Sequence, residues 1–334
     1  MDSSEAAVES KLPPAIEEPA AAGRGLSLPA DFLFHKLAVF MAAVVGATLV
    51  AAVAAIGYDS LPAIKVFGVL GFLESRRWDP VSQQFGAYPF IVGTLVSSAI
   101  AMLLAVPVSF GVAVFISELA PGWIKQPISA AIEMLAAVPS IVYGLWGLLV
   151  FAPAFANLEP WINDHLGAIW GVGALFRGPP MGIGMLAAGI VLAIMILPYI
   201  ASIMRDVFVA TPARLKESAY AMGATTWEVA RRILLPYTRT AVTGGIFLGL
   251  GRALGETMAV TFVIGNSNNL SRSLLMPGAS IPSVIANEFT EATSKLYVSS
   301  LIYLGLVLIA ITLVVQILAV FLLGSLRRAP GGTR

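Results

Sequence analysis

The chain has 334 residues, of which 58% are hydrophobic and only 12% are charged, and its formal net charge is +1. Its mean hydropathy is +0.86. Soluble domains carry about 25% charged residues, so this composition excludes an ordinary soluble domain and indicates a membrane protein. The near-zero net charge gives no electrostatic reason to expect a nucleic-acid partner. Cysteine is absent and the two histidines lie far apart, which excludes disulfides and thiolate metal sites and leaves no predicted metal centre.

The chain begins with an Ala- and Pro-rich segment, residues 1–34, for which we expect a disordered tail. Six apolar runs follow, each long enough to cross a bilayer as a helix, which takes about 20 residues. They are Leu37–Ile56, Tyr88–Ile116, Pro127–Ala156, Gly182–Met204, Ala241–Gly265 and Leu296–Leu326. The sequence therefore predicts an all-α membrane protein, with a six-helix domain over residues 35–326 and a basic tail at 327–334.

The distribution of Lys and Arg predicts the orientation of these helices. If the N-terminus is cytoplasmic, most Lys and Arg residues fall in the inner segments, as the positive-inside rule requires. An even number of spans then places both termini in the cytoplasm. The basic segment between the fourth and fifth apolar runs lies on that same side.

That basic segment is expected to form two short helices. Arg214–Met222 contains good helix formers, and Gly223 suits the left-handed residue that ends a helix. Thr225 or Thr226 can cap a second helix, and Pro236 then interrupts the pattern. The expected product is a compact knob at the membrane surface.

Seven positions in this segment follow a pattern with fixed gaps: Glu217, Ser218, Ala219, Gly223, Ile233, Leu235 and Pro236. The pattern resembles the EAA loop of ABC-importer permeases, E-A-A-x3-G-x9-I-x-L-P, with Ser218 replacing one alanine. The resemblance implies that residues 205–239 form a cytoplasmic coupling loop that docks onto a separate ATPase. The alternative is an amphipathic hairpin that rests on the lipid surface.

Three further segments resemble phosphate permeases of the PstC type. They read EMLAAVPSIVYG at residues 133–144, GLGRALGETMAV at 249–260 and SVIANEF at 283–289. The resemblance covers nearly all of the chain between its tails. It implies the MetI-like architecture of type I ABC importers, and as partners a homologous PstA-type permease, a PstB-type ATPase dimer and an external PstS-type phosphate-binding protein.

Arg252 and Glu256 are two ionisable residues within the fifth apolar run. Each ionised side chain near the bilayer centre costs about 2.5–3.5 kcal/mol, so both should face the protein interior or a water-filled path. Their i, i+4 spacing predicts that they share a helix face and can pair. A guanidinium matches phosphate oxygens, and a carboxylate can accept the proton of hydrogen phosphate. We predict a substrate path; a structural ion pair and a gate between subunits are the alternatives.

Glu133, Pro139 and Ser140 are candidates for a hinge or gate in the third apolar run. Pro139 frees a backbone carbonyl and can bend the helix. The plainer interpretation places Glu133 at a helix start, where its negative charge favours the helix dipole.

The absence of a P-loop pattern and of any catalytic triad predicts a transport subunit rather than an enzyme. The resemblance implies an ATP-driven phosphate importer in a bacterial inner membrane. Bound ATP and Mg are expected on the partner ATPase, and no cofactor on this chain. A permease for another oxyanion (sulfate, molybdate or phosphonate), or a sensory or scaffold subunit without its own path, are the alternatives.

Overall fold

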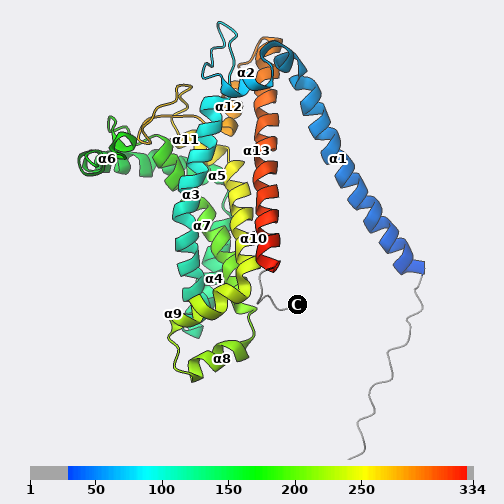
Figure 1. The fold of residues 1–334 in the computed structure, drawn as a ribbon, viewed down its shortest axis with the longest axis vertical. Coiled ribbons are helices and arrows are strands. Elements are labelled where there is room, and N and C mark those ends of the chain that lie inside the picture. The colour runs from blue at the N-terminus through cyan, green and yellow to red at the C-terminus, as the bar shows by residue number, and fades with distance from the viewer. Residues whose placement is uncertain (1–28, 329–334) are drawn as a thin grey trace, which may run out of the picture. The chain divides into compact units, whose positions relative to one another are not determined.

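Figure 1 shows a computed structural model of the protein, which describes residues 29–328. The chain divides into two units, Met1–Ala54 and Ala55–Arg334. The predicted disorder of residues 1–28 and the last residues of the C-terminal tail, 329–334, lie outside the described residues. Helix α1 (Pro29–Phe67) crosses the boundary between the units. Because α1 begins at Pro29, residues 29–34 are helical in the structure, whereas we assigned them to the tail.

The described residues are helical almost throughout, which confirms the all-α class. After α1 come α2 (Val69–Glu74), α3 (Tyr88–Val114), α4 (Gly122–Ala137), α5 (Ser140–Trp146), α6 (Ala152–Leu166), α7 (Met185–Val209), α8 (Ala213–Ala221), α9 (Thr226–Val229), α10 (Leu235–Leu254), α11 (Met258–Val263), α12 (Ile281–Glu288) and α13 (Lys295–Arg328). Three π-helical turns interrupt or extend them, at Phe115–Leu119, Gly147–Phe151 and Ala230–Leu234.

Six helices in the described part of the chain are long and apolar enough to cross a membrane, which confirms the predicted number. They are Phe32–Phe67, Tyr88–Leu119, Ser140–Leu166, Met185–Val209, Thr226–Leu254 and Lys295–Phe321.

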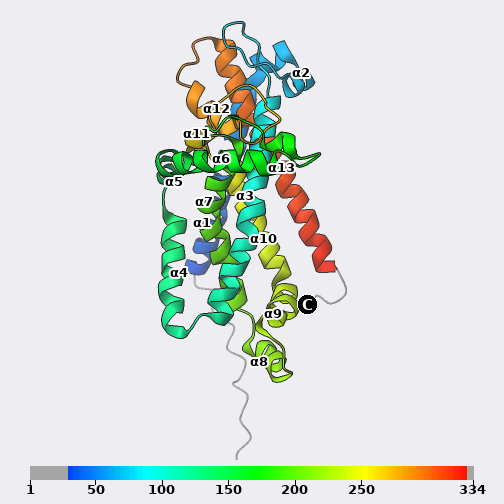
Figure 2. The ribbon, with the colours of Figure 1, turned by 90° about the vertical axis from the view of Figure 1, so that its left-hand side faces the viewer.

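The third predicted span, Pro127–Ala156, is not one helix. The chain breaks at Val138, where ψ is 131°, and Pro139 begins the next helix. Helix α4 runs alongside α7 on one side of the break, and α6 crosses the direction of α3 and α7 on the other (Figures 1 and 2). The proline, which disfavours a helical conformation in the residue before it, is the physical reason.

Helices α3 and α7 form the centre of the second unit because small residues let their backbones approach. Ala101 and Ala105 of α3 are fully buried, as is Ala188 of α7. At Gly189 an added Cβ would lie 2.6 Å from Ile100 Cγ2, so only glycine fits there. This closely packed pair of helices is the central scaffold of the second unit.

Glu288 is the last residue of α12 and joins several segments. Helix α12 lies at the end of the bundle remote from α8 (Figure 2). Its carboxylate accepts hydrogen bonds from Trp78 Nε1 at 2.6 Å and from the Tyr297 hydroxyl at 2.7 Å. Asn268 Nδ2 donates to the other carboxylate oxygen at 3.3 Å. One carboxylate thus ties α12 and α13 to the segments that follow α2 and α11.

Candidate functional site

The predicted coupling loop is a helical hairpin with the expected caps. Helix α8 ends at Ala221, and Gly223 follows in the left-handed region with φ +85°. Thr225 caps α9 reciprocally with Glu228: the Glu228 N–H donates to Thr225 Oγ1 at 3.3 Å, and Glu228 Oε2 accepts the Thr225 N–H at 3.0 Å. Both turn predictions, Gly223 and Thr225, are confirmed.

The first three residues of the motif have different surroundings. Glu217 and Ser218 are exposed, whereas Ala219 is 2% exposed and packs in the same cluster as Val229 and Leu234. The Ser218 hydroxyl donates to the Arg214 carbonyl at 2.6 Å. Serine is therefore tolerated at 218, while position 219 has room only for a small residue.

The prediction that Pro236 interrupts the helical pattern is wrong. Thr226–Leu254 is a single long helix, with Pro236 in the first turn of α10. The π-helical turn Ala230–Leu234 directly precedes it. This wider turn accommodates the proline ring and its missing N–H without ending the helix. Ile233 and Leu235 are half-buried on either side of the buried Leu234.

One buried acid ties the loop to the bundle. Lys216 Nζ lies 3.0 Å from Glu118 Oε1, and the Glu118 side chain is only 6% exposed. The Tyr220 hydroxyl lies 3.4 Å from the other carboxylate oxygen. Glu118 belongs to the π-helical turn that continues α3. The hairpin is thereby attached to the central pair of helices.

The break between α4 and α5 contains two of the three hinge candidates. Pro139 has no N–H for the Leu135 carbonyl, which instead accepts from the Tyr143 hydroxyl at 2.8 Å and from the Val138 N–H at 3.2 Å. Ser140 is the first residue of α5. The prediction that the proline frees a carbonyl and bends the chain is confirmed, but a hinge or gate role for these residues stays a prediction.

Glu133 does not lie at a helix start, because α4 begins at Gly122. It pairs instead with Arg205 of α7, whose Nη2 lies 2.8 Å from Glu133 Oε1. The same nitrogen lies 2.6 Å from Asp206 Oδ1. The Arg205 side chain is 11% exposed, while those of its two acidic partners are more than half exposed. The pair fixes α4 against α7.

Arg252 and Glu256 are not an i, i+4 pair on one helix. Helix α10 ends at Leu254, and Gly255 turns the chain before α11 begins at Met258. Glu256 Oε1 accepts the Ala259 N–H at 3.2 Å, so the carboxylate caps the new helix. No ion pair joins Arg252 to Glu256 in the described chain; the Arg252 guanidinium lies over the Tyr199 ring, 5.3 Å from its centroid.

The two helix breaks lie next to each other. Helix α5, directly after the first break, packs against α11, directly after the second (Figure 1). An added Cβ at Gly144 would lie 2.6 Å from the Phe262 side chain and 3.0 Å from the Met258 carbonyl oxygen. Interrupted helices expose backbone groups and helix ends that can contact an ion, and in other transporters such breaks mark substrate sites.

Sequence reasoning missed the partners of two of these groups. It gave no role to Glu118 or to Arg205, because their partners lie 98 and 72 residues away along the chain. A signal was present in both cases: an acid at the end of an apolar run, and a base at the end of another, each need a partner when a neighbouring helix covers them.

The model of the family described as "Binding-protein-dependent transport system inner membrane component" matches residues 105–328. The chain belongs to this family of membrane-embedded transport components. Its members are permease components, in agreement with the prediction of a transport subunit rather than an enzyme.

Within this family the chain is similar to phosphate transport system permease proteins named PstC. It is 52% identical over 303 residues to the protein of Xylella fastidiosa (strain 9a5c), a match that covers 90% of this chain and 93% of that protein. The identity is 51% to the Haemophilus influenzae protein, over 90% and 95% of the two chains. It is 48% to that of Mesorhizobium japonicum, over 95% and 97%.

Solved structures confirm the MetI-like permease fold. A chain of a bacterial alginate ABC transporter, in complex with a periplasmic protein that holds an alginate pentasaccharide, superposes with a TM-score of 0.58 at 16% identity, over 88% of this chain and 96% of that one. A chain of the inward-facing MetNI methionine ABC transporter gives a TM-score of 0.52 at 15% identity, over 75% and 100%. The shared element is the fold, because identities this low do not carry the substrate.

Proposed function

We propose that this chain is one of two permease subunits of an ATP-driven importer of inorganic phosphate. The observation that carries the proposal is the similarity, over 90–95% of the chain, to proteins named as phosphate permeases. In this proposal a homologous permease completes the path, an external binding protein delivers phosphate, and a separate ATPase dimer binds ATP and Mg. Both termini and the coupling loop are cytoplasmic.

The form of the loop supports a docking role for it. Glu217 is exposed and has no ion-pair partner among the described residues, while Ala219 and Leu234 are buried beneath it. The loop therefore combines a buried apolar core with an exposed polar outer face on which Glu217 lies. We infer that this face contacts the ATPase, and that Lys216 and Glu118 pass the movement of α8 to α3.

The surroundings of Arg252 support a role for its side chain in phosphate passage. Arg252 is half-buried in the last turn of α10, beside the meeting point of two helix breaks. Its guanidinium has no carboxylate partner in the described chain, so its donors are free for an oxyanion. Glu256 keeps one oxygen on the α11 cap, and the other is free to accept the proton of hydrogen phosphate. Sulfate at neutral pH carries no such proton.

The test is uptake of radiolabelled phosphate by cells that lack this gene, complemented at matched membrane levels. We expect wild type to restore uptake and Arg252→Gln to lose most of it. Arg272→Gln, at an exposed arginine in the segment between α11 and α12, is the matched control and should restore uptake fully. Recovery with Arg252→Gln equal to wild type would remove Arg252 from the path, and failure of wild type would exclude phosphate as the substrate.

Uptake of phosphate and of sulfate by the Glu256→Gln variant tests selectivity separately. The variant should lower the ratio of phosphate to sulfate uptake, since an amide does not replace a carboxylate as a proton acceptor. An unchanged ratio would confine Glu256 to capping α11.

A further inference from the structure

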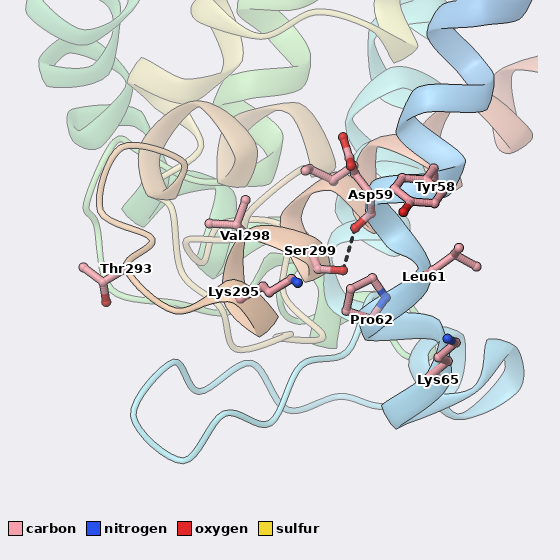
Figure 3. Close-up of a pocket in the computed structure, with 10 residues that line it drawn as sticks. Tyr58, Asp59, Leu61, Pro62, Lys65, Thr293, Lys295, Val298 and Ser299 are labelled. Atoms are coloured by element: carbon pink, nitrogen blue, oxygen red, sulfur yellow. Dashed lines mark hydrogen bonds between the residues drawn. The ribbon is translucent and has the colours of Figure 1, made fainter.

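A groove of about 890 Å³ lies between the last turns of α1 and the first turns of α13. Its walls are two facing helix surfaces, because the lining positions recur at helical spacing on each. Those of α1 are Tyr58, Asp59, Leu61, Pro62 and Lys65; those of α13 are Lys295, Val298, Ser299 and Ile302, with Thr293 just before them. Figure 3 shows the side chains of Leu61 and Lys65 extending from α1, and those of Lys295 and Ser299 from α13.

The two walls are joined by Ser299. Its hydroxyl donates to the Asp59 carbonyl at 2.8 Å, the bond drawn in Figure 3, and accepts the Ala63 N–H at 3.1 Å. Ser299 is 3% exposed and Ala63 is fully buried. The two helices therefore meet closely along one line and diverge on the exposed side. The groove is a fixed feature of this helix pair.

The sequence places this groove at the depth of the lipid headgroups. No charged residue occurs between Leu37 and Tyr58, a stretch long enough to cross the hydrocarbon core, so Asp59 and Lys65 lie beyond that core. Lys295 likewise precedes an uncharged run that continues to Leu326. Tyr58 is 74% exposed, as is typical of a tyrosine in the interfacial aromatic belt.

The charges in the groove favour an anion that carries hydrogen-bond donors. Lys65 and Lys295 form no salt bridge in the described chain, and Asp59 is the one acid in the lining. The lining thus has a net charge of one positive unit. Leu61, Val298 and Ile302 supply an apolar surface in the same groove.

We propose that this groove binds one anionic glycerophospholipid, with its phosphodiester between Lys65 and Lys295. Phosphatidylglycerol has the matching chemistry. Its single negative charge balances the lining, its headgroup hydroxyls can donate to Asp59, and its glycerol and first acyl carbons cover Leu61, Val298 and Ile302. Basic pockets between membrane helices bind anionic lipid headgroups at the cytoplasmic face of other proteins. In the proposed orientation the same charge complementarity applies here at the outer face.

A lipid fits this groove better than free phosphate does. The apolar surface gains nothing from a small hydrated dianion, whereas the acyl carbons of a lipid remove it from water. The carboxylate of Asp59 repels a doubly charged phosphate ion more strongly than it repels the singly charged headgroup of phosphatidylglycerol. A free anion would also have no reason to occupy the headgroup depth of the two helices.

The experiment measures lipid retention by the purified full-length protein in detergent, using native mass spectrometry. Phosphatidylglycerol and phosphatidylcholine are titrated separately against wild type and against Lys65→Gln/Lys295→Gln. We expect wild type to retain one phosphatidylglycerol in preference to phosphatidylcholine. The double variant should bind it about 30-fold more weakly, because each lysine near a lipid surface contributes about 1 kcal/mol to the binding of an anionic lipid. Arg272→Gln, exposed elsewhere on the chain, serves as the control and should bind as wild type does.

Two results would overturn the proposal. The first is equal retention of phosphatidylglycerol by wild type and the double variant. The second is complete displacement of the lipid by millimolar inorganic phosphate, which would make the groove a site for the free anion. Thermal unfolding of both variants without added lipid distinguishes a lost site from a misfolded chain, since two exposed lysines should change it little.

Discussion

Lys216 Nζ lies 3.0 Å from Glu118 Oε1, and this pair connects the α8–α9 hairpin to the π-helical turn that continues α3 at the centre of the bundle. The side chains are 18% and 6% exposed, so the pair is largely shielded from water. Tyr220, one turn further along α8, directs its hydroxyl to the same carboxylate. Helix α8 is therefore held to the end of α3 by a charged contact as well as by the connecting chain.

Replacing Lys216 with Met should loosen α8. The change leaves the Glu118 carboxylate mostly buried without its cation, which costs about 2 kcal/mol of local stability, or about 30-fold in exchange rate. Hydrogen exchange of the α8 amides, measured by mass spectrometry on the protein in lipid nanodiscs, checks this. Adding Glu118→Gln to Lys216→Met should restore much of the protection, because it removes the unpaired charge.

Glu217→Gln is the control for that experiment, since Glu217 is the exposed neighbour of Lys216 and has no ion-pair partner in the described chain. Its α8 amides should exchange at the wild-type rate. If Glu217→Gln loosens α8 as much as Lys216→Met does, the Lys216–Glu118 pair is not what holds the loop.

Ala219→Leu should destabilise the protein by about 1–3 kcal/mol, because the added carbons enter a filled site. Ala219 is 2% exposed and packs in the cluster that contains Val229 and Leu234. Ala221→Leu, two residues on in the same helix, is exposed and should change stability little. Thermal unfolding of the purified variants in detergent compares them. Similar losses from the two substitutions would contradict the burial of position 219.

Gly223→Ala should cost about 1–2 kcal/mol, since φ is +85° at this residue and an L side chain is strained there. No atom lies within 4 Å of the added Cβ, so steric contact plays no part. Gly244→Ala is the matched control. It also has open space, but it lies in helix α10 without a positive φ, so alanine should be neutral or stabilising there. The difference in unfolding temperature between the two variants measures the cost of placing an L side chain at a positive φ.

Local patterns could be predicted from the sequence wherever one residue determines the backbone. Gly223 ends a helix because it alone tolerates the left-handed turn, and Thr225 caps the next helix because its oxygen reaches the N–H of Glu228. Pro139 divides the third apolar run for an equally local reason. The number of spans also follows from apolar length alone.

Contacts that depend on two distant segments could not be predicted in the same way. The i, i+4 spacing of Arg252 and Glu256 indicated a shared face, but it presupposed a helix that continues through Gly255, and α10 ends at Leu254. For Pro236 the sequence indicated an interruption, but the helix continues through it because a π-helical turn precedes the proline. The α4–α5 and α10–α11 breaks lie next to each other through the packing of α5 on α11, which no local pattern encodes.

Arg205 provides the last test, because two carboxylates share its guanidinium. Its Nη2 lies 2.8 Å from Glu133 and 2.6 Å from Asp206, and its own side chain is 11% exposed. Glu133→Gln alone should cost less than about 1 kcal/mol, since Glu133 is 59% exposed and Asp206 still neutralises the arginine.

Glu133→Gln combined with Asp206→Asn should cost about 3 kcal/mol, well beyond the sum of the single effects, because it leaves a nearly buried guanidinium with no counter-charge. Thermal unfolding of the three variants measures this excess. Glu74→Gln, an exposed acid of α2, controls for the loss of one negative charge. Additive losses in the double variant would mean that water, rather than the second carboxylate, stabilises Arg205 when the first is removed.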